Sequence, residues 1–71
     1  MSLTAHSAIA RFLAAAHKTM LSWLKGKRQR DNLDGKGLHE WWYNIMEQRD
    51  GQKMRQKFFT DVLAEAATVS H

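Results

Sequence analysis

The sequence predicts an all-α fold in which two to three amphipathic helices form a helical hairpin or a small bundle. The chain has no proline and only four glycines among its 71 residues, so little interrupts long helices. Its apolar residues recur at the helical period, and no window alternates apolar and polar residues as a half-buried strand does. The hydrophobic fraction of 44% is typical of a globular chain. We therefore expect one small helical domain spanning residues 1–71.

The length of the chain limits the stability of a single copy. A domain of this size buries only ~60% of the surface that its unfolded chain exposes. The chain has no cysteine, so disulfides cannot supply the missing stability. Its three tryptophans, three phenylalanines, one tyrosine and four methionines exceed what three short helices can hide from water. We therefore expect a homodimer, with part of this apolar surface covered by another polypeptide.

The first helix is expected over residues 4–25. Alanine occupies six of its positions and supplies the strongest helix propensity. The helical period places these apolar residues on one face: Ile9, Phe12, Leu13, Ala16, Met20 and Trp23. Gly26 follows directly and suits a left-handed C-cap. The pattern predicts a helix that packs through this face and ends at Gly26.

Residues 26–37 are expected to form a basic, glycine-containing connection. Gly26, Gly35 and Gly37 favour turns, as does Asp34. Four positive charges fall within six residues where the connection begins: Lys25, Lys27, Arg28 and Arg30. Such a run can contact phosphate or anionic lipid, although a solvated loop is the commoner reason for it.

The second helix, expected over residues 38–49, is the element on which we expect the others to pack. Four large apolar residues share one stripe at positions i, i+3, i+4 and i+7: Leu38, Trp41, Trp42 and Ile45. Aromatic side chains bury ~150–250 Å² each, so this stripe holds much of the apolar area of the chain. Tyr43 lies about 100° from Trp42 around the helix, so it should be the exposed aromatic.

The third helix is expected over residues 52–67. Asp50-Gly51 either ends the second helix or lies inside one longer helix at a cost of ~1 kcal/mol. Because no large apolar residue occurs between Glu47 and Lys53, we favour a break at Asp50-Gly51. In an unbroken helix, Arg49, Lys53 and Lys57 would be spaced by four residues and would form a basic ridge.

The residue types that catalysis needs do not occur in a recognisable arrangement. No two of the four histidines lie three or four residues apart, and there is no cysteine, so the sequence offers no local metal site. It has no glycine-rich phosphate loop and no nucleophile with a recognisable base. We therefore predict that the protein is not an enzyme and binds no cofactor.

The net charge of +4 favours an acidic partner. Our first hypothesis is a small regulatory protein that binds and inhibits a larger protein through its helix faces, as phage and plasmid factors do to host enzymes. A basic nucleic-acid-binding regulator is the alternative. A peripheral membrane-surface helix over residues 9–24 is the second alternative. The sequence shows neither a signal peptide nor a membrane-spanning run, so we expect a cytoplasmic protein.

Two kinds of side chain are the candidates for partner contact. The aromatic candidates are Trp23, Trp41, Trp42 and Tyr43. The basic candidates are Arg28, Arg30, Lys53 and Lys57. Tryptophan, tyrosine and arginine are enriched at the centres of protein interfaces. At least two of the aromatic residues should belong to the core instead, and periodicity does not decide which.

Overall fold

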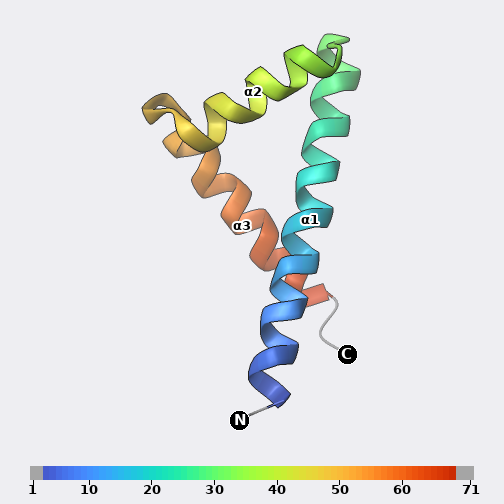
Figure 1. The fold of residues 1–71 in the computed structure, drawn as a ribbon, viewed down its shortest axis with the longest axis vertical. Coiled ribbons are helices and arrows are strands. Elements are labelled where there is room, and N and C mark those ends of the chain that lie inside the picture. The colour runs from blue at the N-terminus through green and yellow to red at the C-terminus, as the bar shows by residue number, and fades with distance from the viewer. Residues whose placement is uncertain (1–2, 69–71) are drawn as a thin grey trace.

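The computed structural model describes residues 3–68, and this part of the chain contains helices and no strand. The helices are α1 (Leu3–Asp31), α2 (Gly35–Glu47) and α3 (Gln52–Thr68), with a short 3-10 helix, η1 (Arg49–Gly51), before α3. In Figure 1, α2 crosses away from the C-terminal end of α1, and α3 returns to the middle of α1, so that the three helices outline a triangle. The predicted all-α fold is confirmed, and the homodimer stays a prediction.

The first helix does not end at Gly26, as the sequence had indicated, but continues to Asp31. Residues 27–31 are mostly good helix formers, and Lys27 forms an ion pair with Asp31 one turn later, which offsets the cost of a glycine inside the helix. The left-handed residue that ends α1 is Asn32, with φ of 52°. Its backbone N–H donates to the carbonyl of Arg28 at 2.8 Å.

The predicted connection over residues 26–37 is therefore wrong at both ends, and only residues 32–34 link α1 to α2. Asp34 is the N-cap of α2, because its carboxylate accepts a hydrogen bond of 2.8 Å from the backbone N–H of Gly37. Gly35 and Gly37 consequently lie inside the first turn of α2, and this helix begins three residues earlier than predicted and ends at Glu47.

The break predicted at Asp50-Gly51 is confirmed, since η1 separates α2 from α3 there. Gly51 is buried, and a Cβ atom at this position would lie against the carbonyl oxygens of Asn44 and Ile45. Arg55 reaches back from α3 and donates to the carbonyls of Ile45 and Gln48, each at 2.6 Å. The turn is therefore tight because Gly51 has no side chain, and it is stabilised by the hydrogen bonds of the Arg55 guanidinium.

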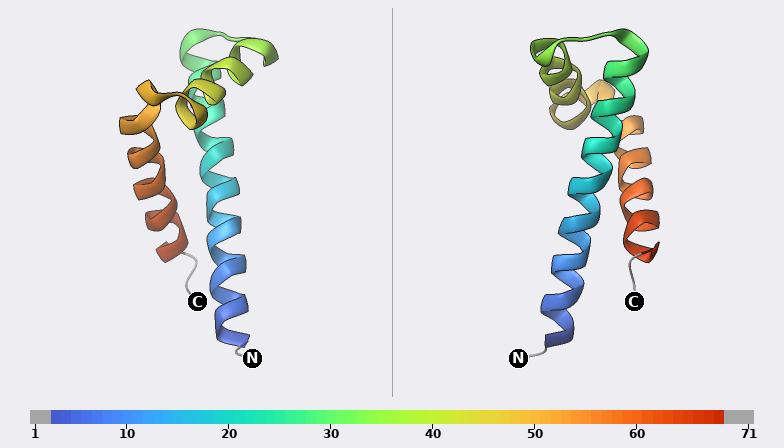
Figure 2. Two further views of the ribbon diagram at one scale, coloured as in Figure 1. Left: turned by 60° about the vertical axis from the view of Figure 1, so that its left-hand side comes forward. Right: turned by 90° about the vertical axis from the view of Figure 1, so that its right-hand side faces the viewer.

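Helices α1 and α3 run antiparallel, side by side (Figure 2). Ala15 and Thr19 of α1 and Val62 of α3 are buried between them, and the Thr19 hydroxyl donates to the carbonyl of Ala15 at 2.8 Å. The predicted face of α1 is only partly covered, because Ile9 and Leu13 are more than half exposed. The helical period places these residues on one face of α1. How much of the face is covered depends on α3, which is much shorter than α1.

The stripe on α2 packs inward as predicted, and Ile45 on it is buried. Its tryptophans join an aromatic cluster with the two other helices, in which the neighbouring ring centroids lie 5.2–6.4 Å apart: Trp23 of α1, Trp41 and Trp42 of α2, and Phe58 of α3. Edge-to-face contacts in this range are favourable. All three helices therefore meet at the tryptophan stripe.

Among residues 3–68, no helix has both the length and the apolar character needed to cross a bilayer.

Candidate functional site

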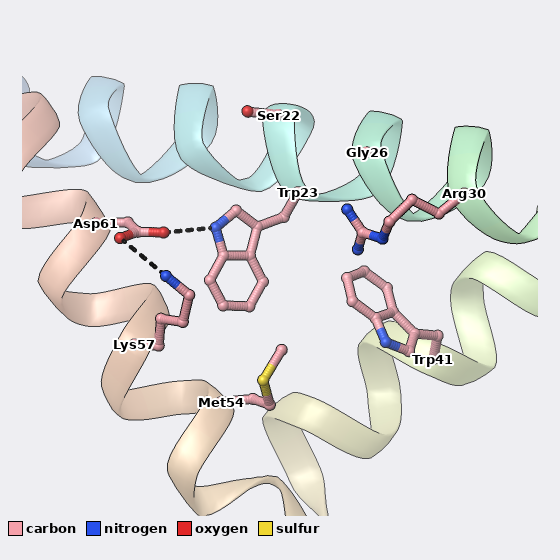
Figure 3. Close-up of a pocket in the computed structure, with 8 residues that line it drawn as sticks. All are labelled: Ser22, Trp23, Gly26, Arg30, Trp41, Met54, Lys57 and Asp61. Atoms are coloured by element: carbon pink, nitrogen blue, oxygen red, sulfur yellow. Dashed lines mark hydrogen bonds and ion pairs between the residues drawn. The ribbon is translucent and has the colours of Figure 1, made fainter.

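A groove of about 340 Å³ opens between α1 and α3, next to the aromatic cluster (Figure 3). Three helices line it, with these residues: Ser22, Trp23, Gly26, Arg30, Trp41, Met54, Lys57 and Asp61. The set combines two indoles and a thioether with two cations and one carboxylate. Half of the predicted contact residues come together in this groove.

Two indole rings form the apolar wall of the groove. The ring of Trp23 is fixed by a 2.9 Å hydrogen bond from its Nε1 to Asp61 Oδ2 and by an edge-to-face contact with Phe58. The ring of Trp41 lies 6.4 Å from that of Trp23, centroid to centroid, and Lys27 Nζ lies 5.5 Å from its centre. Because both rings are held by other helices, the wall exists before any partner binds.

Arg30 and Lys57 place positive charge at the rim. In Figure 3 the Arg30 side chain runs back along α1 over Gly26, toward the ring of Trp41. Gly26 gives it room, since a Cβ atom there would lie 3.1 Å from Arg30 Nη1. Lys57 Nζ lies 3.9 Å from Asp61 Oδ1, whereas Arg30 forms no ion pair within residues 3–68. The lining of the groove therefore carries a net positive charge, and no described carboxylate neutralises its guanidinium.

Lys27, three residues before Arg30 on the same helix, is already neutralised. Lys27 Nζ pairs with the carboxylate of Asp31 on the outside of the last turn of α1. The hydrogen bond from Lys27 holds the pKa of Asp31 below its ordinary value, and the positive charges of Lys27 and Arg30 act in the same direction, while desolvation opposes them. Lys27 thus serves the helix and the Trp41 ring, which leaves Arg30 as the groove's available guanidinium.

The structure brings together four of the eight predicted contact residues, Trp23, Trp41, Arg30 and Lys57, in this groove. Trp42 lies in the aromatic cluster against Phe58 and is half-buried, which fits a core role. The periodicity of the sequence did not separate these two roles, because all three tryptophans lie on inward faces of their helices.

The other predicted residues lie apart from the groove. Tyr43 is half exposed, as predicted, on the outer surface of α2 beside His39 and Asn44. Arg28 is exposed on the outer side of α1, and Lys53 is exposed on α3. Tyr43 and Arg28 do not share a surface with the groove, whereas Lys53 lies one turn before the groove residue Lys57 on α3.

Sequence reasoning missed four lining residues: Ser22, Gly26, Met54 and Asp61. Met54 is one of several large apolar residues of α3, and the local pattern does not single it out. Asp61 had no local signal, because its partner Trp23 lies 38 residues earlier. Gly26 was misread as a helix end.

The basic residues do not form the single positive surface that nucleic-acid binding would favour. Helices α1 and α3 meet α2 at its opposite ends (Figure 1), so most cations near the end of α1 lie apart from those at the start of α3, although Arg30 and Lys57 both line the groove. The helix break also removes Arg49 from the line of Lys53 and Lys57, so the basic ridge of an unbroken helix does not form. Arg55 is engaged with the carbonyls of Ile45 and Gln48.

Within residues 3–68, no three histidine, aspartate or glutamate side chains gather closely enough to hold a metal ion. Comparison with known proteins gives no further identification: no protein family matches the sequence, and no curated protein or solved structure is significantly similar to it.

Proposed function

We propose that this protein is a small, non-enzymatic regulator that binds an acidic and apolar segment of a larger protein in the groove between α1 and α3. The observation that carries the proposal is the guanidinium of Arg30 beside the rings of Trp23 and Trp41, with no ion-pair partner among the side chains of residues 7–68. While the segment is bound in the groove, the partner cannot use it for its own activity. We therefore expect the partner to be inhibited.

The chemistry of the groove fits a peptide segment with a carboxylate next to an apolar side chain. A carboxylate can accept two parallel hydrogen bonds from the guanidinium of Arg30, the strongest type of surface pairing. The neighbouring apolar side chain can lie against the Trp41 ring and the side chain of Met54, which is 39% exposed. Tryptophan and arginine at the centre of a contact typically supply most of its binding energy.

The nucleic-acid alternative has less support, because the cations are dispersed and two of them are used inside the fold. The membrane alternative also has less support. It needs Trp23 as an interfacial anchor, whereas the Trp23 indole is hydrogen-bonded to Asp61 on α3. Both alternatives predict binding that falls steeply with salt, through phosphate contacts or through anionic lipid.

Affinity capture tests the proposal, with a lysate of the cells in which the protein naturally occurs and with matched charge-reversal variants. The wild-type chain is compared with Arg30→Glu, which reverses the charge of the groove, and with Arg28→Glu, which makes the same change on the outer side of α1. We expect one protein to be retained by the wild type and by Arg28→Glu, and to be lost with Arg30→Glu. The activity of that protein should fall when the purified wild-type chain is added.

Three results would count against the proposal. One is that the wild-type chain retains no protein from the lysate. Another is that Arg28→Glu and Arg30→Glu lose the same proteins, since then net charge alone is responsible. The third is that nuclease treatment of the lysate abolishes capture, which would favour the nucleic-acid alternative.

A further inference from the structure

A second surface, on the other side of the α1–α3 pair, is strongly apolar. Four side chains on it, which we call the apolar face, are each more than half exposed: Ile9, Leu13, Phe59 and Leu63. Ile9 and Leu13 lie one turn apart on α1, and Phe59 and Leu63 lie one turn apart on α3. The rings of Phe12 and Phe59, 5.9 Å apart between centroids, connect the two helices at this surface.

Helix geometry places this face away from the polar side of the helix pair. The polar side is marked by the ion pair between Lys18 and Glu65, whose charged atoms are 3.1 Å apart. At about 100° per residue, Leu13 lies about 140° from Lys18 around α1, and Leu63 lies about 160° from Glu65 around α3. The groove also opens on the polar side, since Ser22 and Asp61 line it. The apolar face and the groove can therefore be occupied at the same time.

We propose that the apolar face binds the same face of a second copy of this chain. Two copies that each carry a net charge of +4 repel one another, and this repulsion is weakest when the contact surface itself carries few cations. Most residues that continue this side of the two helices carry no charge: Ala16, Met20, Gln56, Ala66 and Ala67. Arg55, which lines this surface beside Gln56 and Phe59, has its guanidinium hydrogen-bonded to the carbonyls of Ile45 and Gln48. Depletion of charged residues is typical of the centre of an interface.

The size and the symmetry of the face also suit a second copy. The 17 residues of α3 give a length of ~25 Å, and two helices of ~10 Å diameter give a width of ~20 Å. A corrugated surface with this outline approaches the ~800 Å² per partner of an ordinary protein interface. A two-fold axis can set the α1 half of one copy on the α3 half of the other, because both halves are apolar.

The small size of the core means that dimerisation would add to the stability of the protein. Within residues 7–68, the apolar side chains that are fully buried are Ala15, Ile45 and Val62. Such a core is small for a domain without disulfides, and covering Leu13, Phe59 and Leu63 in a dimer extends it. This inference does not depend on the proposed function, since the groove stays open in either oligomeric state.

Sedimentation equilibrium of the full-length chain over a wide concentration range tests the dimer. We expect the wild type to approach twice its chain mass of 8.2 kDa. The decisive variant is Leu63→Lys, and its matched control is Leu21→Lys, because both leucines are 51% exposed. Leu21 lies about 140° around α1 from the buried Ala15 and Thr19, on the side that points away from α3, and about 100° from the row of Ile9 and Leu13. We expect Leu63→Lys to raise the dissociation constant by about tenfold or more, because it buries an unpaired charge, and Leu21→Lys to leave it unchanged.

The thermal midpoint of the wild type gives a second measurement that needs no variant. If folding is coupled to dimerisation, this midpoint rises with protein concentration. A wild type that sediments as a monomer throughout, with a midpoint independent of concentration, would overturn the proposal. It would also be overturned if Leu21→Lys weakened association as much as Leu63→Lys does. Capture of the partner by the Arg28→Glu and Arg30→Glu variants is scored separately, so either idea can fail alone.

Discussion

The indole Nε1 of Trp23 donates a hydrogen bond to Oδ2 of Asp61 at 2.9 Å, which ties α1 to α3 across 38 residues of sequence. The bond fixes the wall of the groove, because it holds the Trp23 ring between Phe58 and the ring of Trp41. It also orients Asp61, whose second oxygen faces Lys57. Helix packing and groove geometry thus depend on the same pair of residues.

Removing this hydrogen bond should lower the stability of the fold modestly. Trp23→Phe keeps an aromatic ring against Phe58 and removes the donor, and Asp61→Ala removes the acceptor. In a double-mutant cycle we expect a coupling free energy of about 0.5–1.5 kcal/mol, the usual net value for one hydrogen bond. Urea unfolding followed by circular dichroism measures it. A coupling of zero would mean that the bond does not contribute.

Two glycines of similar sequence context should respond differently to alanine. Gly51→Ala places a Cβ atom against the carbonyl oxygens of Asn44 and Ile45, so the backbone must move, and we expect a loss of about 1–3 kcal/mol. Gly35→Ala, at the start of α2, meets nothing within 4 Å and should be neutral or slightly stabilising. Denaturant midpoints of the two variants make the comparison. Equal effects would contradict the tight turn at η1.

Gly26→Ala distinguishes the observed course of α1 from the end predicted from sequence. Inside a helix, alanine is favoured over glycine by about 0.5–1 kcal/mol, so the variant should be more stable than the wild type. The added Cβ meets only the flexible end of Arg30, which can shift slightly. Thermal unfolding with helix content from circular dichroism gives the sign. A destabilised variant would instead favour a left-handed cap at Gly26.

Arg55 should matter to the turn between α2 and α3 more than its position on the surface indicates. Arg55→Met keeps an unbranched side chain but removes the donor to the carbonyls of Ile45 and Gln48. We expect a loss of about 1.5–3 kcal/mol, as for hydrogen bonds from a charged group. Lys53→Met, which changes an exposed cation two residues earlier on α3, is the control and should change the free energy of unfolding little. A similar effect of both substitutions would show that charge, rather than capping, is responsible.

Local signals were enough for the parts of the fold that depend on a single helix. The stripe of Leu38, Trp41 and Trp42 packs inward and Tyr43 is exposed, because the helical period alone fixes which side chains share a face. The break at Gly51 was also visible, since the apolar stripe lapses there.

The limits of α1 depended on local signals that oppose one another. Gly26 resembled a cap, but the helix formers after it and the pair of Lys27 with Asp31 carry the helix to Asn32. A glycine costs about 1 kcal/mol in a helix, a penalty small enough for neighbouring interactions to override.

By itself, the sequence determined the helices, their apolar stripes and the positive charge, because each follows from residue type and spacing. Only the tertiary structure decided that Arg30 lies beside Trp41, that Asp61 receives the Trp23 indole, and that Leu13 is left in solvent. The physical reason is that periodicity orients a side chain around its own helix axis. Which neighbouring side chain it contacts depends on the length and direction of the other helices, and the apolar stripe of a single helix does not specify these.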